Sequence, residues 1–404
     1  MEKIKGFKNT FILTEKGIIK TNIIITDGII SYIGDREINE MITLDEDLLI
    51  VPGFIDEHTH GINGYDVMDG SVDTLKNIAV EVAKEGVTSF LVTTSTASIK
   101  KIISTLHAVK KYKEQDNLKY AEIIGVHLEG PFLSKTYQGA QIGEYIINPS
   151  IDIMKELISE SDNNIKFVTL APEEENGLEL IKYLKEQNIV FSVGHSNATY
   201  DDLEESIKNG LTSVTHTYNA QKPIHHREVG VVGASLLFDE LYTELICDGI
   251  HVSSPAVELL CKNKPLDKVV LITDSLPEKG LKDGVYIDND QEIYVKNNEL
   301  RLKDGTLAGS CLTMNQAIKN IIKFSNVSFI DAINFATRNP AKNLNIFDKV
   351  GSIEVGKLAN FTIVDKELNV YQTIRCGNII YKKGDKLMWL NILLSLQKKC
   401  QLMN

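Results

Sequence analysis

The chain has 404 residues, of which 43% are hydrophobic and 24% are charged, and its formal net charge is −12. This composition is typical of a folded protein and leaves room for one large α/β domain and a smaller one. The acidic balance and the lack of a Lys/Arg cluster argue against nucleic acid as a partner, since a phosphate backbone binds to concentrated positive charge.

The sequence also predicts a soluble, cytoplasmic protein. Residues 1–6 carry charges and no apolar stretch, so we expect no secretion signal. The longest apolar-rich run, residues 387–396, is far shorter than the roughly 20 residues that cross a bilayer, and we expect no membrane association. The five cysteines lack CxxC spacing, which is typical of free thiols in a reducing compartment.

The first 51 residues have the pattern of short strands joined by tight turns. Asp27-Gly28 is a strong hairpin signal between two of them. Strand-like runs are visible at residues 10–13, 17–20, 22–25 and 29–33. Because so few strands cannot bury a sizeable core by themselves, we expect other parts of the chain to complete this sheet.

From residue 52 onward, apolar strand-like runs alternate with helical stretches, which predicts a parallel α/β architecture. Eight such runs occur, at residues 54–58, 89–93, 123–127, 167–170, 189–193, 213–216, 244–247 and 269–273. Helices of an outer ring are expected at residues 71–86, 98–114, 177–187 and 200–210. Eight strands over about 250 residues are typical of a (β/α)8 TIM-type barrel, so we assign residues 52–345 to a barrel whose active site lies at the strand C-termini.

The end of the chain returns to shorter elements. A β insertion is predicted within residues 280–298. Later helices and strands are expected at residues 314–324, 328–337, 350–365 and 371–381. The last two segments would complete the N-terminal sheet, which gives a small β-sandwich domain built from residues 1–51 and 346–386. Residues 387–404 are a C-terminal tail, expected as a helix that packs on the barrel or on a partner.

Acidic and imidazole side chains recur where the expected barrel strands end, and five of the nine histidines lie there. These side chains are His58, His60, His127, Glu129, His195, His216 and Asp274. Alternation along a strand places His58 and His60 on the same side. A lone His-x-His is as often a pair of solvated loop histidines, but the repetition on five strands favours a metal site.

The residue types suit a hydrolytic metal centre. Glu129, His195 and His216 would hold one divalent ion with a coordination position open for water. His58 and His60 would build a second position that shares Glu129 or a hydroxide with the first. Since a metal ion lowers the pKa of water and polarises a carbonyl, hydrolysis of an acyl group is the expected chemistry.

Asp274, at the end of the eighth run, has the type and place of a residue that carries a proton from water to the leaving group. The alternative role for Asp274 is that of an ordinary helix N-cap. The sequence contains neither a Gly-x-Ser-x-Gly elbow nor a Walker-type phosphate loop, so no serine nucleophile is expected.

A second group of residues has the side chains expected of an anion-binding site. Asn219-Ala220, the run His225-His226-Arg227 and His251 follow the expected strands six and seven. Arginine binds phosphate bidentately, which predicts a pocket for a phosphorylated ligand in an otherwise acidic protein. The alternative is that residues 225–227 form a solvated loop or a subunit contact.

Taken together, several motifs resemble the N-acetylglucosamine-6-phosphate deacetylase family of the amidohydrolase superfamily. They occur in order over nearly the whole chain, at residues 52–61 (PGFIDEHTHG), 127–132 (HLEGPF), 194–199 (GHSNAT), 215–216 (TH) with 219–220 (NA), 225–228 (HHRE) and 307–310 (LAGS). His-x-His is shared by the whole superfamily, whereas HLEGPF and HHRE are specific to this deacetylase family.

The resemblance implies that Glu129, His195 and His216 bind the principal metal, zinc or iron, and that Asp274 is the catalytic acid/base. A second ion is compatible with the retained His58 and His60. Expected substrate contacts are Gln141, Asn219, Ala220, His226, Arg227, His251, Leu307, Ala308 and Gly309. The resemblance also implies a homodimer in which His226 or Arg227 reaches the phosphate across the interface.

The implied reaction removes the acetyl group from N-acetyl-D-glucosamine 6-phosphate, in amino-sugar catabolism or cell-wall recycling. Three alternatives remain: the galactosamine epimer as substrate, a cyclic-amide hydrolase of the same superfamily, and a non-catalytic scaffold. Cyclic-amide hydrolases typically bridge two metals with a carbamylated lysine, and here Leu170-Ala171-Pro172 closes strand four. Departures from the family pattern bear on fine specificity and occur at Tyr218, Gln221, Ser275-Leu276 and Asn360.

Overall fold

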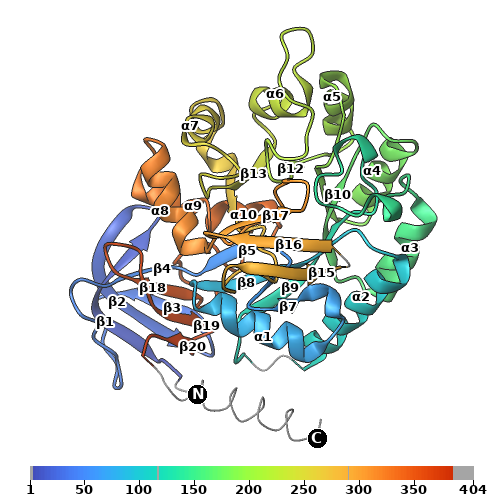
Figure 1. Ribbon diagram of the computed structural model, residues 1–404. Coiled ribbons are helices and arrows are strands. Elements are labelled where there is room, and N and C mark those ends of the chain that lie inside the picture. The colour runs from blue at the N-terminus through green and yellow to red at the C-terminus, as the bar shows by residue number, and fades with distance from the viewer. Residues whose placement is uncertain (1–2, 116–117, 290, 385–404) are drawn as a thin grey trace, which may run out of the picture.

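The computed structural model describes residues 3–115, 118–289 and 291–384, and its centre is a barrel of eight parallel strands (Figure 1). The strand order is β14-β13-β12-β11-β10-β9-β8-β5, so neighbours in space are neighbours along the chain. The bounds are β5 Phe54–Thr59, β8 Val87–Thr94, β9 Glu122–Glu129, β10 Ile165–Leu170, β11 Val190–Val193, β12 Ser213–Val214, β13 Tyr242–Ile246 and β14 Val269–Ile272. The predicted barrel is confirmed.

The two edge strands meet just beyond their C-terminal ends. The amide of Asp274 donates to the carbonyl of His58 at 2.9 Å, and the amide of His60 donates to the carbonyl of Ser275 at 2.9 Å. Because these bonds join the segment after β14 to β5, the first and last strands present their terminal side chains at one rim.

Helices surround the barrel as in the predicted outer ring (Figure 1). Their bounds are α1 Val72–Ala83, α2 Ile99–Glu114, α3 Ile151–Glu160, α4 Gly177–Glu186, α5 Tyr200–Lys208, α6 Gly230–Leu237, α7 Ser254–Asn263, α8 Met314–Phe324, α9 Phe329–Asn334 and α10 Arg338–Asn343. Side-chain caps define several starts, and Thr199 and Asp202 form a capping box at α5. Within the described residues, no helix is long and apolar enough to span a bilayer.

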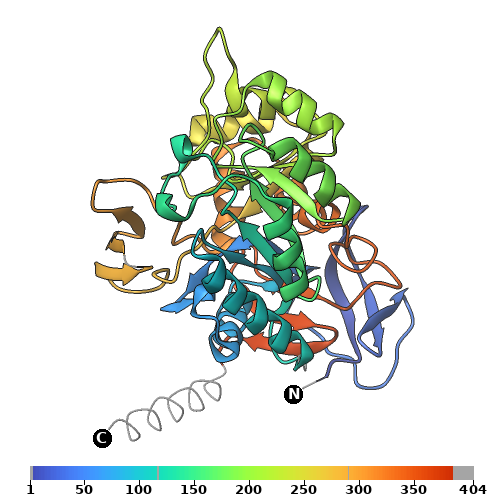
Figure 2. The same cartoon turned by 90° about the vertical axis from the view of Figure 1, so that its right-hand side faces the viewer.

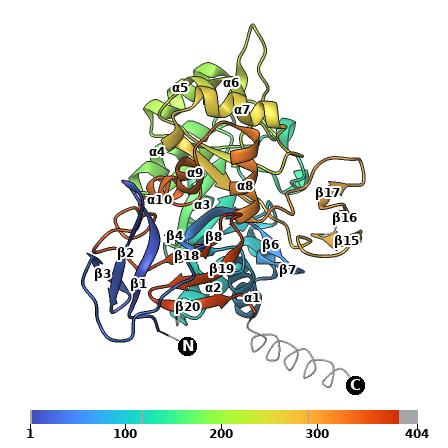
Figure 3. The ribbon, with the colours of Figure 1, turned by 90° about the vertical axis from the view of Figure 1, so that its left-hand side faces the viewer.

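The small domain is a seven-stranded sheet with the order β20-β19-β18-β4-β1-β2-β3. Its strands are β1 Gly6–Thr14, β2 Gly17–Thr26, β3 Ile29–Gly34, β4 Leu49–Pro52, β18 Phe361–Val364, β19 Val370–Arg375 and β20 Asn378–Lys382. Figure 3 shows the blue and red strands from the two chain ends on the same side of the barrel. The sheet buries its own core, in which Phe7 and Phe361 pack edge to face at 6.3 Å. The prediction that both chain ends build this domain is confirmed, while the predicted tail at residues 387–404 lies outside the described residues.

An antiparallel three-stranded insertion follows β14, as the sequence predicts. It consists of β15 Gly284–Asp288, β16 Gln291–Lys296 and β17 Glu299–Leu302, and it projects from the barrel (Figure 2). A short pair, β6 Gly61–Ile62 and β7 Tyr65–Asp66, lies after β5. Cys247, Cys261 and Cys311 are free thiols.

Candidate metal centre and active site

Six polar side chains from five strand ends converge at one rim of the barrel, and we call them the strand-end cluster. Its members are His58, His60, Glu129, His195, His216 and Asp274, all between 0% and 8% exposed. The alternative that His58 and His60 are solvated loop histidines is therefore wrong, because both side chains are buried. Asp274 is also no helix cap, since the next helix along the chain, α8, begins at Met314.

Glu129, at the end of β9, lies between all four imidazoles of the strand-end cluster. On one side, Oε1 lies 3.1 Å from Nε2 of His216 and 3.3 Å from Nε2 of His195. These two Nε2 atoms are 3.0 Å apart. Such a buried group of one carboxylate and two imidazoles has the donor set of a Zn²⁺ or Fe²⁺ site.

His58, His60 and Asp274 form an adjoining group. Oδ1 of Asp274 lies 3.2 Å from Nε2 of His60 and 3.4 Å from Nε2 of His58. Glu129 touches this group as well, at 3.3 Å from His60 and 3.5 Å from His58. The two groups therefore share one carboxylate.

The backbone is unusual at three positions of this cluster. His195, His216 and Asp274 have φ angles of 48°, 30° and 47°, in the left-handed region that non-glycine residues rarely occupy. Each residue lies two positions beyond the last residue of its strand, at the rim of the barrel. The strand β12 ends at Val214, earlier than the predicted strand of residues 213–216.

Contacts on the outer ring nitrogens orient the imidazoles. Nδ1 of His195 lies 3.0 Å from the carbonyl of Tyr137, which only accepts, so Nδ1 carries a proton and Nε2 is the nitrogen that faces Glu129. Nδ1 of His60 lies 3.3 Å from Oγ of Ser95, and Nδ1 of His58 lies 3.0 Å from Oε2 of Glu244. Outer-nitrogen bonds of this kind are typical of metal-binding histidines, so the residues present fit a divalent ion.

The charges of the strand-end cluster stabilise one another. Burial alone would raise the pKa of Glu129, but the charge of His58 and the bonds from His195 and His216 hold it well below its ordinary value. The pKa of Asp274 is set in the same way: burial alone would raise it, but His58 and His60 lower it below its ordinary value. Both carboxylates are therefore ionised, as metal ligands and proton acceptors must be.

A cavity of about 250 Å³ opens above the strand-end cluster. Seven of the expected substrate residues line it: Gln141, Asn219, Ala220, His251, Leu307, Ala308 and Gly309. Gln141 donates to Oε2 of Glu129 at 2.7 Å and accepts from the amide of Thr96 at 2.8 Å, which holds it at the cavity wall. Nδ1 of His251 pairs with Asp248 at 2.6 Å, so Nε2 is the nitrogen that a ligand can reach.

The structure does not bring His226 and Arg227 into this cavity. Both are exposed on the segment of residues 221–229 between β12 and α6, which we call the 221–229 loop (Figure 1). Arg227 donates to Nε2 of His226 at 2.8 Å. Paired amide-to-carbonyl bonds between His225 and Glu228, both 3.0 Å, close the turn that carries them.

The sequence interpretation missed several residues around the site. Glu244 contacts His58, Ser95 contacts His60, and Asp288, Asn289 and Gln291 of the insertion line the cavity. A signal existed for Glu244, because a carboxylate inside a short strand that ends in apolar residues points to a buried partner. The insertion residues carried no such signal, since nothing in their sequence fixes how the insertion folds over the barrel.

Comparison with known proteins places this geometry in a family: the chain belongs to the amidohydrolase family, whose sequence pattern matches residues 49–382. Over 389 residues it is 42% identical to N-acetylglucosamine-6-phosphate deacetylase of Bacillus subtilis (strain 168), which covers 94% of this chain and 98% of that protein. It is 36% identical over 365 residues to N-acetylgalactosamine-6-phosphate deacetylase of Escherichia coli O157:H7, covering 89% of this chain and 95% of that protein. The crystal structure of N-acetylglucosamine-6-phosphate deacetylase from Thermotoga maritima has a TM-score of 0.86 and 36% identity, and covers 94% of this chain and all of that one.

Proposed function

We propose that this protein is a metal-dependent hydrolase that converts N-acetyl-D-glucosamine 6-phosphate and water into D-glucosamine 6-phosphate and acetate. The observation that carries the proposal is the strand-end cluster at the floor of the cavity, with Glu129 shared between two imidazole groups. The similarity to deacetylases of phosphorylated amino sugars supports the substrate class.

Glu129, His195 and His216 would hold the principal ion, zinc or iron, and His58 and His60 would support a second. A bound divalent ion would polarise the amide carbonyl and increase the acidity of water at this position. Asp274 is ionised, faces the same space, and serves as the base that takes a proton from the attacking water. The same carboxyl then gives the proton to the amine nitrogen as the C–N bond breaks, which completes the exchange of acetyl for hydrogen.

The phosphate handle is proposed at His251 of the chain itself and at His226 and Arg227 of a second copy. The exposure of the 221–229 loop supports this arrangement, because a homodimer would give the loop a cavity to reach. Ile224 on the loop and Leu237 at the end of α6 are 50% and 61% exposed and would be covered there. Light scattering of the purified protein should give twice the chain mass.

We also propose that residues 52–345 form the catalytic barrel and that residues 1–51 with 346–386 form the small domain. A cytoplasmic location stays a prediction of the sequence.

A second candidate substrate is N-acetylgalactosamine 6-phosphate, because the Escherichia coli relative with that name is 36% identical. Metal analysis together with acetate release from both phosphorylated epimers tests the proposal. We expect bound divalent metal and a higher kcat/KM for the glucosamine form. A metal-free protein with full turnover would contradict the metal centre, and the opposite preference would favour the second candidate.

A further inference from the structure

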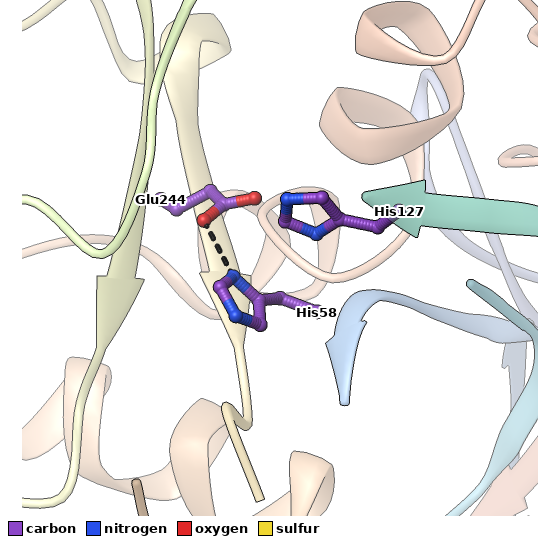
Figure 4. Close-up of side chains that lie close together, drawn as sticks. All are labelled: His58, His127 and Glu244. Atoms are coloured by element: carbon purple, nitrogen blue, oxygen red, sulfur yellow. Dashed lines mark hydrogen bonds and ion pairs between the residues drawn. The ribbon is translucent and has the colours of Figure 1, made fainter. Parts of the chain in front are cut away.

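Beneath the floor of the cavity lies a third polar group, formed by His58, His127 and Glu244 (Figure 4). Their ligand-type atoms lie within 4.8 Å of one another, and all three residues are fully buried. Only His58 belongs to the strand-end cluster. The group therefore extends the site downward, into the interior of the barrel.

Hydrogen bonds show that this group is not arranged to hold an ion. Nδ1 of His127 lies 3.2 Å from the carbonyl of Glu57, which only accepts, so Nδ1 carries the proton. Nε2 of His127 then accepts from the hydroxyl of Thr169 at 2.7 Å. With both nitrogens engaged, His127 has no lone pair left for a metal, and its ring packs edge to face on His58 at 4.6 Å.

Glu244 makes the contacts that reach the cavity floor. A single oxygen, Oε2, accepts from Nδ1 of the His58 ring at 3.0 Å and from the backbone amide of His216 at 3.0 Å. A carboxylate only accepts here, so Nδ1 of His58 carries a proton and Nε2 is the nitrogen that faces Glu129 and His60. The second bond holds the backbone of His216, whose φ of 30° needs such support.

We propose that Glu244 is a positioning residue that holds one ligand of each proposed metal position at the same time. This inference rests on the proposed metal-dependent function. Its consequence is that the two positions are not independent: releasing Oε2 frees the His58 ring and the His216 backbone together. Loss of a supporting residue of this kind typically lowers metal affinity about 10- to 100-fold.

The test compares Glu244→Leu with Glu57→Leu, which removes a carboxylate of equal burial that bonds to Asn343 at 2.8 Å and to no ligand. Metal-free proteins are titrated with Co²⁺ against a chelator, and the visible spectrum reports the ligand set. We expect Glu244→Leu to bind about 10- to 100-fold more weakly, with an altered spectrum, and Glu57→Leu to stay within about threefold of wild type. Glu244→Gln keeps an acceptor oxygen and should restore the spectrum.

Equal affinity in Glu244→Leu and wild type would overturn the inference, as would equal losses in both leucine variants. A wild-type protein that binds no Co²⁺ would instead contradict the proposed function. If Glu244→Leu does not fold, nitrogen-15 NMR of the metal-loaded wild type decides the matter. A proton on Nδ1 of His58 is expected, and a His58 that carries its proton on Nε2 would overturn the inference.

Discussion

The strand-end cluster and the 221–229 loop carry the same kinds of side chain in opposite surroundings. In the cluster, histidines and carboxylates are at most 8% exposed and are fixed by strand ends that the parallel ladder places side by side. In the loop, His225, His226 and Arg227 are exposed and bond mainly to one another. The difference teaches that the strand-end cluster is assembled by the fold of one chain, whereas the phosphate-binding role proposed for the loop depends on a ligand or a second copy.

The largest effect is expected from Glu129→Ala, which breaks the strand-end cluster. It removes the carboxylate that lies between four imidazoles and that the two proposed metal positions share. Acetate release should fall well beyond the roughly 100-fold that loss of a supporting residue costs, and bound metal should disappear. Metal analysis and the acetate assay measure both. Glu122→Ala, at the opposite end of the same strand, is the control and should keep both. Full metal with full turnover in Glu129→Ala would disprove the ligand assignment.

Asp274→Asn should separate chemistry from metal binding within the cluster. The amide keeps the size of the side chain and cannot take up a proton, so kcat should fall about 10²- to 10⁴-fold. Metal bound through Glu129, His195 and His216 should remain, because their mutual contacts do not involve Asp274. Steady-state kinetics and metal analysis on the same preparation check this. A kcat within tenfold of wild type would mean that another group carries the proton.

Arg227→Ala tests the loop side of the comparison. A buried charge-assisted contact to phosphate is worth roughly 2–5 kcal/mol, and each 1.4 kcal/mol is about tenfold, so kcat/KM for the phosphorylated sugar should fall about 30-fold or more. Slow hydrolysis of unphosphorylated N-acetylglucosamine should hardly change. Lys222→Ala, a cation on the same loop, serves as the control. Equal losses for both sugars would make Arg227 a structural or interface residue.

The smallest effect concerns a buried carboxylate outside both regions. Burial, reinforced by the charge of Asp288, raises the pKa of Glu278 from 4.5 to about 7. The folded chain keeps a proton that the unfolded chain releases, so this contribution to stability is present below pH 4.5 and is lost as the pH rises through 7. Glu278→Gln should therefore raise the Tm by about 1–3 °C at pH 8 and leave it unchanged at pH 4.

This variant contrasts two buried carboxyl groups. Imidazole partners lower the pKa of Glu129, whereas burial raises the pKa of Glu278. Thermal melting across the pH range is the measurement. Glu156→Gln, at an exposed position of α3, is the control and should show no pH-dependent difference. If the Tm of Glu278→Gln and the Tm of wild type changed with pH in parallel, Glu278 would have the same pKa in the folded and unfolded states.

The barrel and most of the candidate site could be predicted from the sequence. The spacing of apolar runs marks the strands, and the site residues lie at the ends of those runs. The predicted run at residues 89–93 lies in β8, which is buried throughout, and its apolar centre Phe90-Leu91-Val92 indicates this burial. Glu129, His195 and Asp274 follow such runs, and parallel strands must bring their ends to one rim. What escaped prediction depends on closure of the whole fold: the carbonyl of Tyr137 on His195 and the carboxylate of Glu244 under His58 are 58 and 186 residues away along the chain.

The left-handed backbone at His195, His216 and Asp274 has a consequence for attempts to engineer this protein. Each such residue costs roughly 1–3 kcal/mol relative to a relaxed conformation, and glycine at the same position would relieve that cost. Variant libraries ranked by melting temperature alone would therefore enrich chains in which the proposed metal ligands and the proposed proton carrier have been replaced. A screen for a more heat-stable enzyme has to measure turnover as well as melting temperature. At these three positions stability favours glycine, whereas turnover favours the residue that is present.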